Sequence, residues 1–396
     1  MKPNDVVITG IGLVSCLGEG AEEHWRKLTA HEPAPVMDAE RFAPYTVHPL
    51  PAIDWGLQIA KRGDQRQMET WQRLGTYAAG LALDDAAVKD DETLCATMDM
   101  VIAAGGGERD EAVDAAILAA SENRADQGVL LNEHLTTELR PTLFLAQLSN
   151  LLAGNISIVH KVTGSSRTFM GEEGAGVSAI ETAAARIRCG QSTHALVGGA
   201  FQTEHPDMLL GYELGGYLHR GPWKPVWQRQ GSEGGGVVTG SGAAFLVLES
   251  RQHAQERGRK AYARLGAVSS GRSRRSTTDL QAEIAALAEK TGVSGNPLLA
   301  VSGASGAHKA TAAELAALGA MTGIGLRGFG TLTGDMAAGR VRVAVALAAL
   351  AAHNKAAYPA FDRQAETAFA GSTDTVLATT VGYHQFEGMA LVHAAD

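Results

Sequence analysis

Short apolar runs rich in β-branched residues alternate along this chain with longer, alanine-rich amphipathic stretches. The short runs are typical of buried strands: Val6–Thr9, Met100–Ala104, Ala195–Val197 and Ala243–Leu248. The longer stretches have helical periodicity: Ala21–Leu28, Trp71–Leu83, Val177–Arg188 and Val341–Ala352. Because each amphipathic helix must bury its apolar face on a neighbouring layer, the alternation predicts an α/β fold with layered sheets.

The length of 396 residues suits two domains or one large duplicated domain. A first half closes with the strand at Ala243–Leu248, and a surface helix is expected at His253–Arg259. The strand-and-helix plan then repeats from about Tyr262 to Val392, so we predict halves of residues 1–250 and 251–396. The arginine-rich segment Ser269–Thr278 is expected to be an exposed loop.

Charge, hydropathy and cysteine content indicate which partners, cofactors and cellular location to expect. The formal net charge of −9 disfavours nucleic acids and anionic membranes as partners. No apolar run reaches the roughly 18 residues of a membrane span, and the N-terminus enters a strand without a signal-like segment. Cys16, Cys95 and Cys189 are sparse and fit no metal-binding spacing. These observations predict a cytoplasmic protein without a bound metal.

Several longer segments follow one another in a recognisable order: VVITGIGLVSCLGEGAEEHWRKLTA (6–30), KRGDQRQMETW (61–71), LRPTLFLAQLSNLLAGNISI (139–158), GSGAAFLVLESRQHAQERG (240–258) and VGYHQFEGMALV (381–392). In this order they resemble the elongating β-ketoacyl-carrier-protein synthases, the condensing enzymes of fatty-acid and polyketide synthesis. The resemblance covers residues 6 to 392. It implies the thiolase fold, a five-layered αβαβα sandwich of two pseudo-repeated halves that is normally dimeric, with one helix in the 139–158 segment.

The same resemblance locates the catalytic positions, and all of them are replaced. The nucleophilic cysteine aligns with Glu173, and the first histidine aligns with Gly303 in VSGASGA. The lysine and the second histidine align with Gly330 and Asp335 in GTLTGD. A carboxylate is a poor nucleophile towards a thioester, and an aspartate would repel the charge that develops on decarboxylation. We expect Glu173 and Asp335 together to form a repulsive anionic pocket.

Glu173 has two readings. As a carboxylate at a helix N-terminus it is stabilised by the helix dipole, by about 0.3–1 kcal/mol. The alternative is a glutamyl-anhydride intermediate, which lacks acid–base support here. His384 in the last loop is a candidate replacement base, although packing or a surface role is the simpler interpretation.

Other positions follow from the resemblance alone. It implies that Leu143, Phe144, Leu145 and Gln147 lie at the dimer interface and line an acyl tunnel, with ordinary helix packing as the alternative for the leucines. Tyr383 takes the place of an aromatic gate. Lys61, Arg62 and Arg66 are candidates for docking an acyl carrier protein, and solvated surface charge is the alternative.

The function that fits best is a catalytically inactive, chain-length-factor-like subunit. It would pair with an active ketosynthase, or form a homodimer, and shape the acyl tunnel of fatty-acid, polyketide or polyene synthesis. Losing every catalytic group fits this role, because groups that act as a unit lose their value together. One alternative is an acyltransferase with glutamate-based thioester chemistry or malonyl-carrier decarboxylation; another is a stand-alone binder of carrier protein or lipid. No cofactor is predicted, because the glycine-rich GIGLRG at 323–328 is not followed by the helix of a dinucleotide site.

Overall fold

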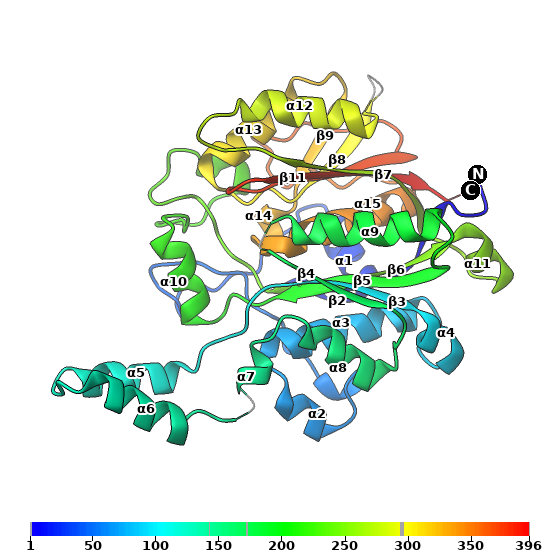
Figure 1. Ribbon diagram of the computed structural model, residues 1–396. Helices are drawn as coiled ribbons and strands as arrows, with labels where there is room; N and C mark the ends of the chain where they lie inside the picture. The colour runs from blue at the N-terminus through cyan, green and yellow to red at the C-terminus, as the bar shows by residue number, and fades with distance from the viewer. Residues whose placement is uncertain (1, 142, 172, 294–296, 396) are drawn as a thin grey trace.

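The computed structural model describes residues 2–141, 143–171, 173–293 and 297–395 and has the predicted five layers (Figure 1). Two sheet regions sandwich a central helical layer of α9 (Ala175–Arg188) and α15 (Arg340–Asn354). Helices α3 (Thr70–Asp85) and α8 (Leu151–His160) cover the outer face of the first region. Helices α12 (Leu280–Thr291) and α13 (His308–Gly319) cover the second.

The strands form one continuous mixed sheet in the order β4-β3-β5-β6-β1-β7-β11-β10-β8-β9, with β2 (Gly18–Glu19) beside β1. The first region contains β1 (Val6–Ser15), β3 (Asp99–Ala104), β4 (Ser166–Met170), β5 (His194–Phe201) and β6 (Gly242–Ser250). The second contains β7 (Ala263–Arg272), β8 (Leu298–Ser302), β9 (Ile324–Gly328), β10 (Thr375–Val381) and β11 (Phe386–Ala394). Antiparallel pairing of Val6 with Leu265 and of Ile8 with Ala263 joins the two regions.

The remaining helices are shorter: α1 (Gly20–Leu28), α2 (Arg62–Gln67), α4 (Glu92–Thr97), α5 (Glu111–Ser121), α6 (Gln127–Thr137), α7 (Leu143–Ala146), α10 (Pro206–Leu214), α11 (Arg251–Glu256) and α14 (Gly330–Thr333). Three 3₁₀ turns complete the described elements: Trp55–Leu57, Val226–Arg229 and Ala337–Gly339. Figure 1 shows α5 and α6 as a hairpin that projects away from the layered body. Across the described ranges, no helix combines the length and apolar character that crossing a bilayer requires.

The predicted strands and helices are confirmed, with bounds that tertiary contacts extend. Strand β1 continues to Ser15 because its glycines let α3 approach closely. A Cβ at Gly12 would lie 2.0 Å from the carbonyl oxygen of Ala78. The division into residues 1–250 and 251–396 stays a prediction.

Three sequence expectations are wrong in detail. The surface helix expected at His253–Arg259 is α11, which Ser250 caps and which ends before Gly258, where φ is +68°. Part of the loop expected at Ser269–Thr278 is strand, since β7 runs to Arg272. The expected helix over 139–158 is two helices, α7 and α8. A cap sets the start of α11 and cross-strand pairing with β11 sets the extent of β7, and helical or strand periodicity encodes neither.

The centre of the molecule is α15, which is buried from Arg340 to Ala352. An alanine-rich helix that is apolar all round suits a layer enclosed on both faces, because its small side chains let both sheet regions pack against it. Only two charged residues, Arg340 and Arg342, lie within this buried stretch.

A buried carboxylate ties β6 to the helix that follows it. Glu249 has no exposed surface, and it accepts two hydrogen bonds from Arg257, of 2.8 and 2.7 Å, and one of 2.6 Å from His253. The Thr9 hydroxyl of the neighbouring strand β1 also donates to it. Burial alone would raise the pKa of Glu249, but these donors outweigh burial and lower the pKa to about 2.

Replacing Arg257 with methionine should lower the free energy of unfolding by about 2–3 kcal/mol, because it leaves a buried carboxylate short of its main donor. Glu249 stabilises the fold above its unfolded pKa of about 4.3, and this contribution should fade as the pH falls towards about 2. Urea unfolding at several pH values measures both effects. The exposed Arg26, paired with Glu23, is the matched control, and Arg26→Met should cost less than about 0.5 kcal/mol. Equal losses for the two variants would contradict the assignment.

Candidate functional site

Three of the four positions predicted to replace catalytic residues converge on one buried side chain, that of Arg340. Glu173 precedes α9, Gly303 follows β8, and Asp335 follows α14. Arg340 is the first residue of α15 and is 2% exposed. The start of α9, the end of β8 and the end of α14 therefore meet at the start of the central helix α15.

Arg340 makes contacts on several sides of its guanidinium group. Its Nε lies 2.9 Å from Oδ1 of Asp335, and it donates to the carbonyl oxygen of Ala337 at 3.1 Å. Its Nη1 donates to the carbonyl oxygens of Gly303 and Val381 at 3.2 and 3.0 Å. The guanidinium thus links α14, the end of β8 and the end of β10.

The Arg340–Asp335 pair is ionic. Burial raises the pKa of Asp335, the nearby Glu173 adds to the rise, and Arg340 opposes it. Burial alone would lower the pKa of Arg340, but Asp335 and Glu173 more than offset burial, so the pKa is raised. The hydroxyl of Tyr212 donates to Oδ2 of Asp335 at 3.2 Å. Arg340 therefore offsets part of the negative charge of the expected anionic pocket, although Glu173 still raises the pKa of Asp335.

The carboxylate of Glu173 is held by the last loop of the chain. Its Oε1 accepts from the backbone N–H of His384 at 2.7 Å, and its Oε2 accepts from those of Gln385 at 2.9 Å and Phe386 at 3.4 Å. These N–H groups have the kind of geometry that stabilises an oxyanion in acyl transfer, and here a resident carboxylate occupies them. Hydrogen bonds to both oxygens also stabilise the anion and weaken it as a nucleophile.

The two glycines at replaced positions have no room for larger side chains. A Cβ at Gly303 would lie 2.8 Å from the Cβ of Arg340 and 3.0 Å from the Cγ2 of Thr380. A Cβ at Gly330 would lie 2.5 Å from the carbonyl oxygen of Ala304. An imidazole or a lysine at these positions requires the surrounding structure to move.

Sequence reasoning missed a second buried acid beside this site. Glu314, on α13, has no exposed surface and accepts hydrogen bonds from Ser302 at 2.7 Å and Thr379 at 3.3 Å. Burial raises its pKa to about 7. The sequence did carry a signal for Arg340: charged residues in the otherwise apolar GRVRVAVALAAL are exceptional for a buried helix.

The residues predicted to line a tunnel lie mostly on the surface of this chain. Leu143 is buried, whereas Phe144 and Leu145 are 71% and 49% exposed. Gln147 is exposed and donates to the carbonyl oxygen of Glu108 at 3.3 Å. Tyr383 is buried, with its ring 4.3 Å from that of Tyr217. His384 is exposed, which agrees with a surface role.

The docking candidates Lys61, Arg62 and Arg66 lie on or next to α2 and are all exposed. Within the described ranges none of the three forms an ion pair. They are therefore accessible to an acidic partner.

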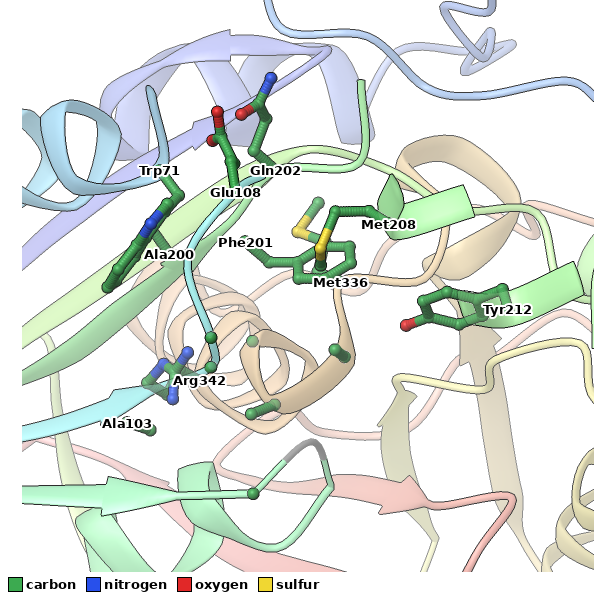
Figure 2. A pocket seen from close by; sticks show the side chains of 16 residues that line it. Trp71, Ala103, Glu108, Ala200, Phe201, Gln202, Met208, Tyr212, Met336 and Arg342 are labelled. Carbon is green, nitrogen blue, oxygen red and sulfur yellow. The ribbon is translucent and has the colours of Figure 1, made fainter. Parts of the chain in front are cut away.

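A cavity of about 80 Å³ lies beside the polar network of Arg340 and Asp335, between α15 and the first sheet region, and Tyr212 and Ala337 line both (Figure 2). Its wall is mainly apolar and is formed by Trp71, Ala200, Phe201, Met208 and Met336, with Arg342 at one end. None of Leu143, Phe144, Leu145 and Gln147 is among the described residues that line it.

One cluster brings possible metal ligands together. Ligand atoms of Glu111, His205 and Asp207 lie within 4.8 Å of one another. The Nδ1 of His205 lies 2.9 Å from Oε1 of Glu111 and also contacts the Asp207 carboxylate. Because imidazole–carboxylate contacts account for this cluster, it requires no ion, and the absence of a metal stays a prediction.

Comparison with known proteins places this geometry in a family. The family model for the N-terminal domain of β-ketoacyl synthases matches residues 3–254. The chain belongs to the β-ketoacyl synthase family. The 3-oxoacyl-[acyl-carrier-protein] synthase 2 of Vibrio harveyi is 27% identical over 271 residues, which are 67% of this chain and 62% of the relative.

Two further comparisons extend the similarity. The tetracenomycin polyketide synthase ketoacyl synthase beta subunit of Streptomyces glaucescens is 27% identical over 263 residues, or 64% of this chain and 60% of the relative. The solved structure of the ishigamide ketosynthase/chain length factor superposes with a TM-score of 0.77 at 19% identity and covers 100% of both chains. That structural match confirms the thiolase-type fold of the β-ketoacyl synthase family.

Replacing Arg340 with methionine should lower the free energy of unfolding by about 3–5 kcal/mol, because it leaves the Asp335 carboxylate buried and unpaired. The double variant Arg340→Met/Asp335→Leu should recover most of that loss, since removing both charges of a buried pair is often neutral. Urea unfolding of both variants measures the coupling. Arg363→Met, which removes an exposed pair with Glu32, is the control and should change stability little. A double variant no more stable than the single one would count against the ion pair.

Proposed function

We propose that this chain is a non-condensing ketosynthase-like subunit that pairs with an active β-ketoacyl synthase and shapes the acyl tunnel of the pair. The observation that carries the proposal is the filled site around Arg340. Its ion pair with Asp335 and the capture of Glu173 by backbone N–H groups take up the space and the donors that condensation would use. The chain keeps the fold of the family, but the polar groups at this site bind one another.

The surface offers a place for a partner. The sheet ends at β9 on one side and at β4 on the other. Strand β9 is almost entirely buried, whereas every residue of β4 is exposed or half-buried, and Met170 is 73% exposed. An open sheet edge presents unpaired backbone groups that readily pair with another strand. Exposed Phe144 and Ile158 on the preceding helices add apolar area.

Relatives support pairing as the mode of action. One is named as a beta subunit of a polyketide ketoacyl synthase, and a structural neighbour is named as a ketosynthase/chain length factor. The matched stretch spans only 60–62% of the length of the curated relatives, so their activities come to this chain as part of the proposal. Exposed Lys61, Arg62 and Arg66 are the proposed contacts to an acyl carrier protein, which would present an acidic surface.

The purified chain, given acyl- and malonyl-carrier protein, should show less than about one-thousandth of the turnover of an intact family member assayed alongside it. Intact-mass spectrometry of the carriers and of the protein is the measurement. The variant Glu173→Cys/Gly303→His/Gly330→Lys/Asp335→His should stay inactive, because Arg340 occupies the space beside Gly303. Turnover by the natural chain, or an acyl adduct on Glu173, would favour the glutamate-based acyltransferase instead.

Charge placed on the open edge should prevent pairing. Met170→Lys and Phe144→Lys should each weaken association with a co-expressed, intact ketosynthase from the same genome by about tenfold or more, because a desolvated lysine has no partner there. Leu57→Lys, which alters a residue 66% exposed outside β4, is the matched control. Light scattering of the co-purified complexes measures the effect. Association that is unchanged in both edge variants would place the interface elsewhere.

A further inference from the structure

Arg342 is a buried cation to which the described part of the chain offers no counter-charge. It is 1% exposed, and among the described residues neither its Nε nor its Nη1 has a hydrogen-bond acceptor. Its neighbour on the same helix, Arg340, contacts a carboxylate and three carbonyl oxygens. The two arginines therefore have opposite surroundings, although they are two residues apart.

The space around Arg342 is made by glycines. A Cβ at Gly199 on β5 would lie 2.8 Å from Nη2, and a Cβ at Gly176 on α9 would lie 3.1 Å from Nη1. The guanidinium therefore lies in a cradle between the central layer and the first sheet region that side chains at these positions would fill. Its location is built into the packing of two elements and does not depend on a surface loop.

A lone buried charge is costly. Removing an ion from water costs several kcal/mol, and a nearby counter-charge normally repays that cost. Burial lowers the pKa of Arg342 to about 9, so the group is still cationic at neutral pH. No described carboxylate offsets the effect of burial on it. The missing component is an anion.

Arg342 faces a cavity that fits a small anion with an apolar body. The volume of about 80 Å³ is roughly half that of a cavity known to bind benzene, about 150 Å³. Trp71, Phe201 and Met336 supply apolar wall, and the exposed Gly105 and Gly106 line the mouth.

The other charged group of the lining is Glu108, whose pKa is raised by burial. Figure 2 shows it apart from Arg342, with its carboxylate directed away from the arginine. An anion beside Arg342 is therefore not opposed by an adjacent carboxylate.

We infer that this cavity is a binding site for a carboxylate on a short aliphatic body, with Arg342 as the counter-ion. The ligand is either a free short-chain acid or the carboxylate end of an acyl group that enters through the mouth. A guanidinium donates strong charge-assisted hydrogen bonds to a carboxylate, and the described residues supply no acceptor for Nε or Nη1 of Arg342. The inference does not rest on the proposed pairing, since this chain alone forms the cavity.

The test uses the full chain without a partner and four probes: propionate, propionamide, succinyl-pantetheine and butyryl-pantetheine. Isothermal titration calorimetry, at constant ionic strength, should show propionate binding about 10- to 100-fold more tightly than its neutral amide. Tighter binding of succinyl-pantetheine than of butyryl-pantetheine, with little binding of propionate, would assign the carboxylate to an acyl end. In either result, Arg342→Met should abolish the preference for the charged probe. Arg363→Met, at an exposed site, should leave it unchanged.

Thermal unfolding supplies a second readout. Without ligand, Arg342→Met should melt at or above the temperature of the natural chain, because an unpaired buried charge is removed. The inference is overturned if the natural chain binds charged and neutral probes equally or binds none of them. It is also overturned if Arg342→Met keeps the preference. The comparison of charged with neutral probes uses the natural chain, so it decides the question even if the variant does not fold.

Discussion

The ion pair between Arg340 and Asp335 is the interaction on which the rest of this site depends. It lies where α14, the ends of β8 and β10, and the start of α15 meet, and both partners are almost fully buried. A buried cation of this kind is stable only with its acceptors in place, so it fixes the loops that carry them. The tight space at Gly303 follows directly, because the Arg340 side chain lies where a larger residue would extend.

Glu173 also interacts with Arg340 and is held by the last loop of the chain. Its carboxylate adds to the negative field around Arg340 and takes the backbone N–H groups of the last loop. Arg340, Asp335, Glu173 and the backbone around them thus form one polar network. This network links the ends of several elements within the fold of the β-ketoacyl synthase family.

The two arginines of α15 have different surroundings. Arg340 is saturated with acceptors and is structural, whereas Arg342 is unpartnered and borders a cavity. The open edge at β4 is a third, independent feature on the outside of the sheet. The molecule therefore combines a densely paired polar network at the start of α15 with a neighbouring cavity and an open sheet edge.

The sequence by itself determined the α/β class and the order of the main elements, because periodicity and motif order are local properties of the chain. Its assignment of four replaced catalytic positions stays a prediction. It did not locate the end of α11 or the extent of β7, which depend on a cap and on cross-strand pairing. Only the tertiary structure decided what fills the replaced site. The site residues come from separate segments of the chain: Glu173, Gly303, Asp335 and Arg340. Their charges interact strongly only because folding brings them within a few ångströms of one another and burial removes the water between them.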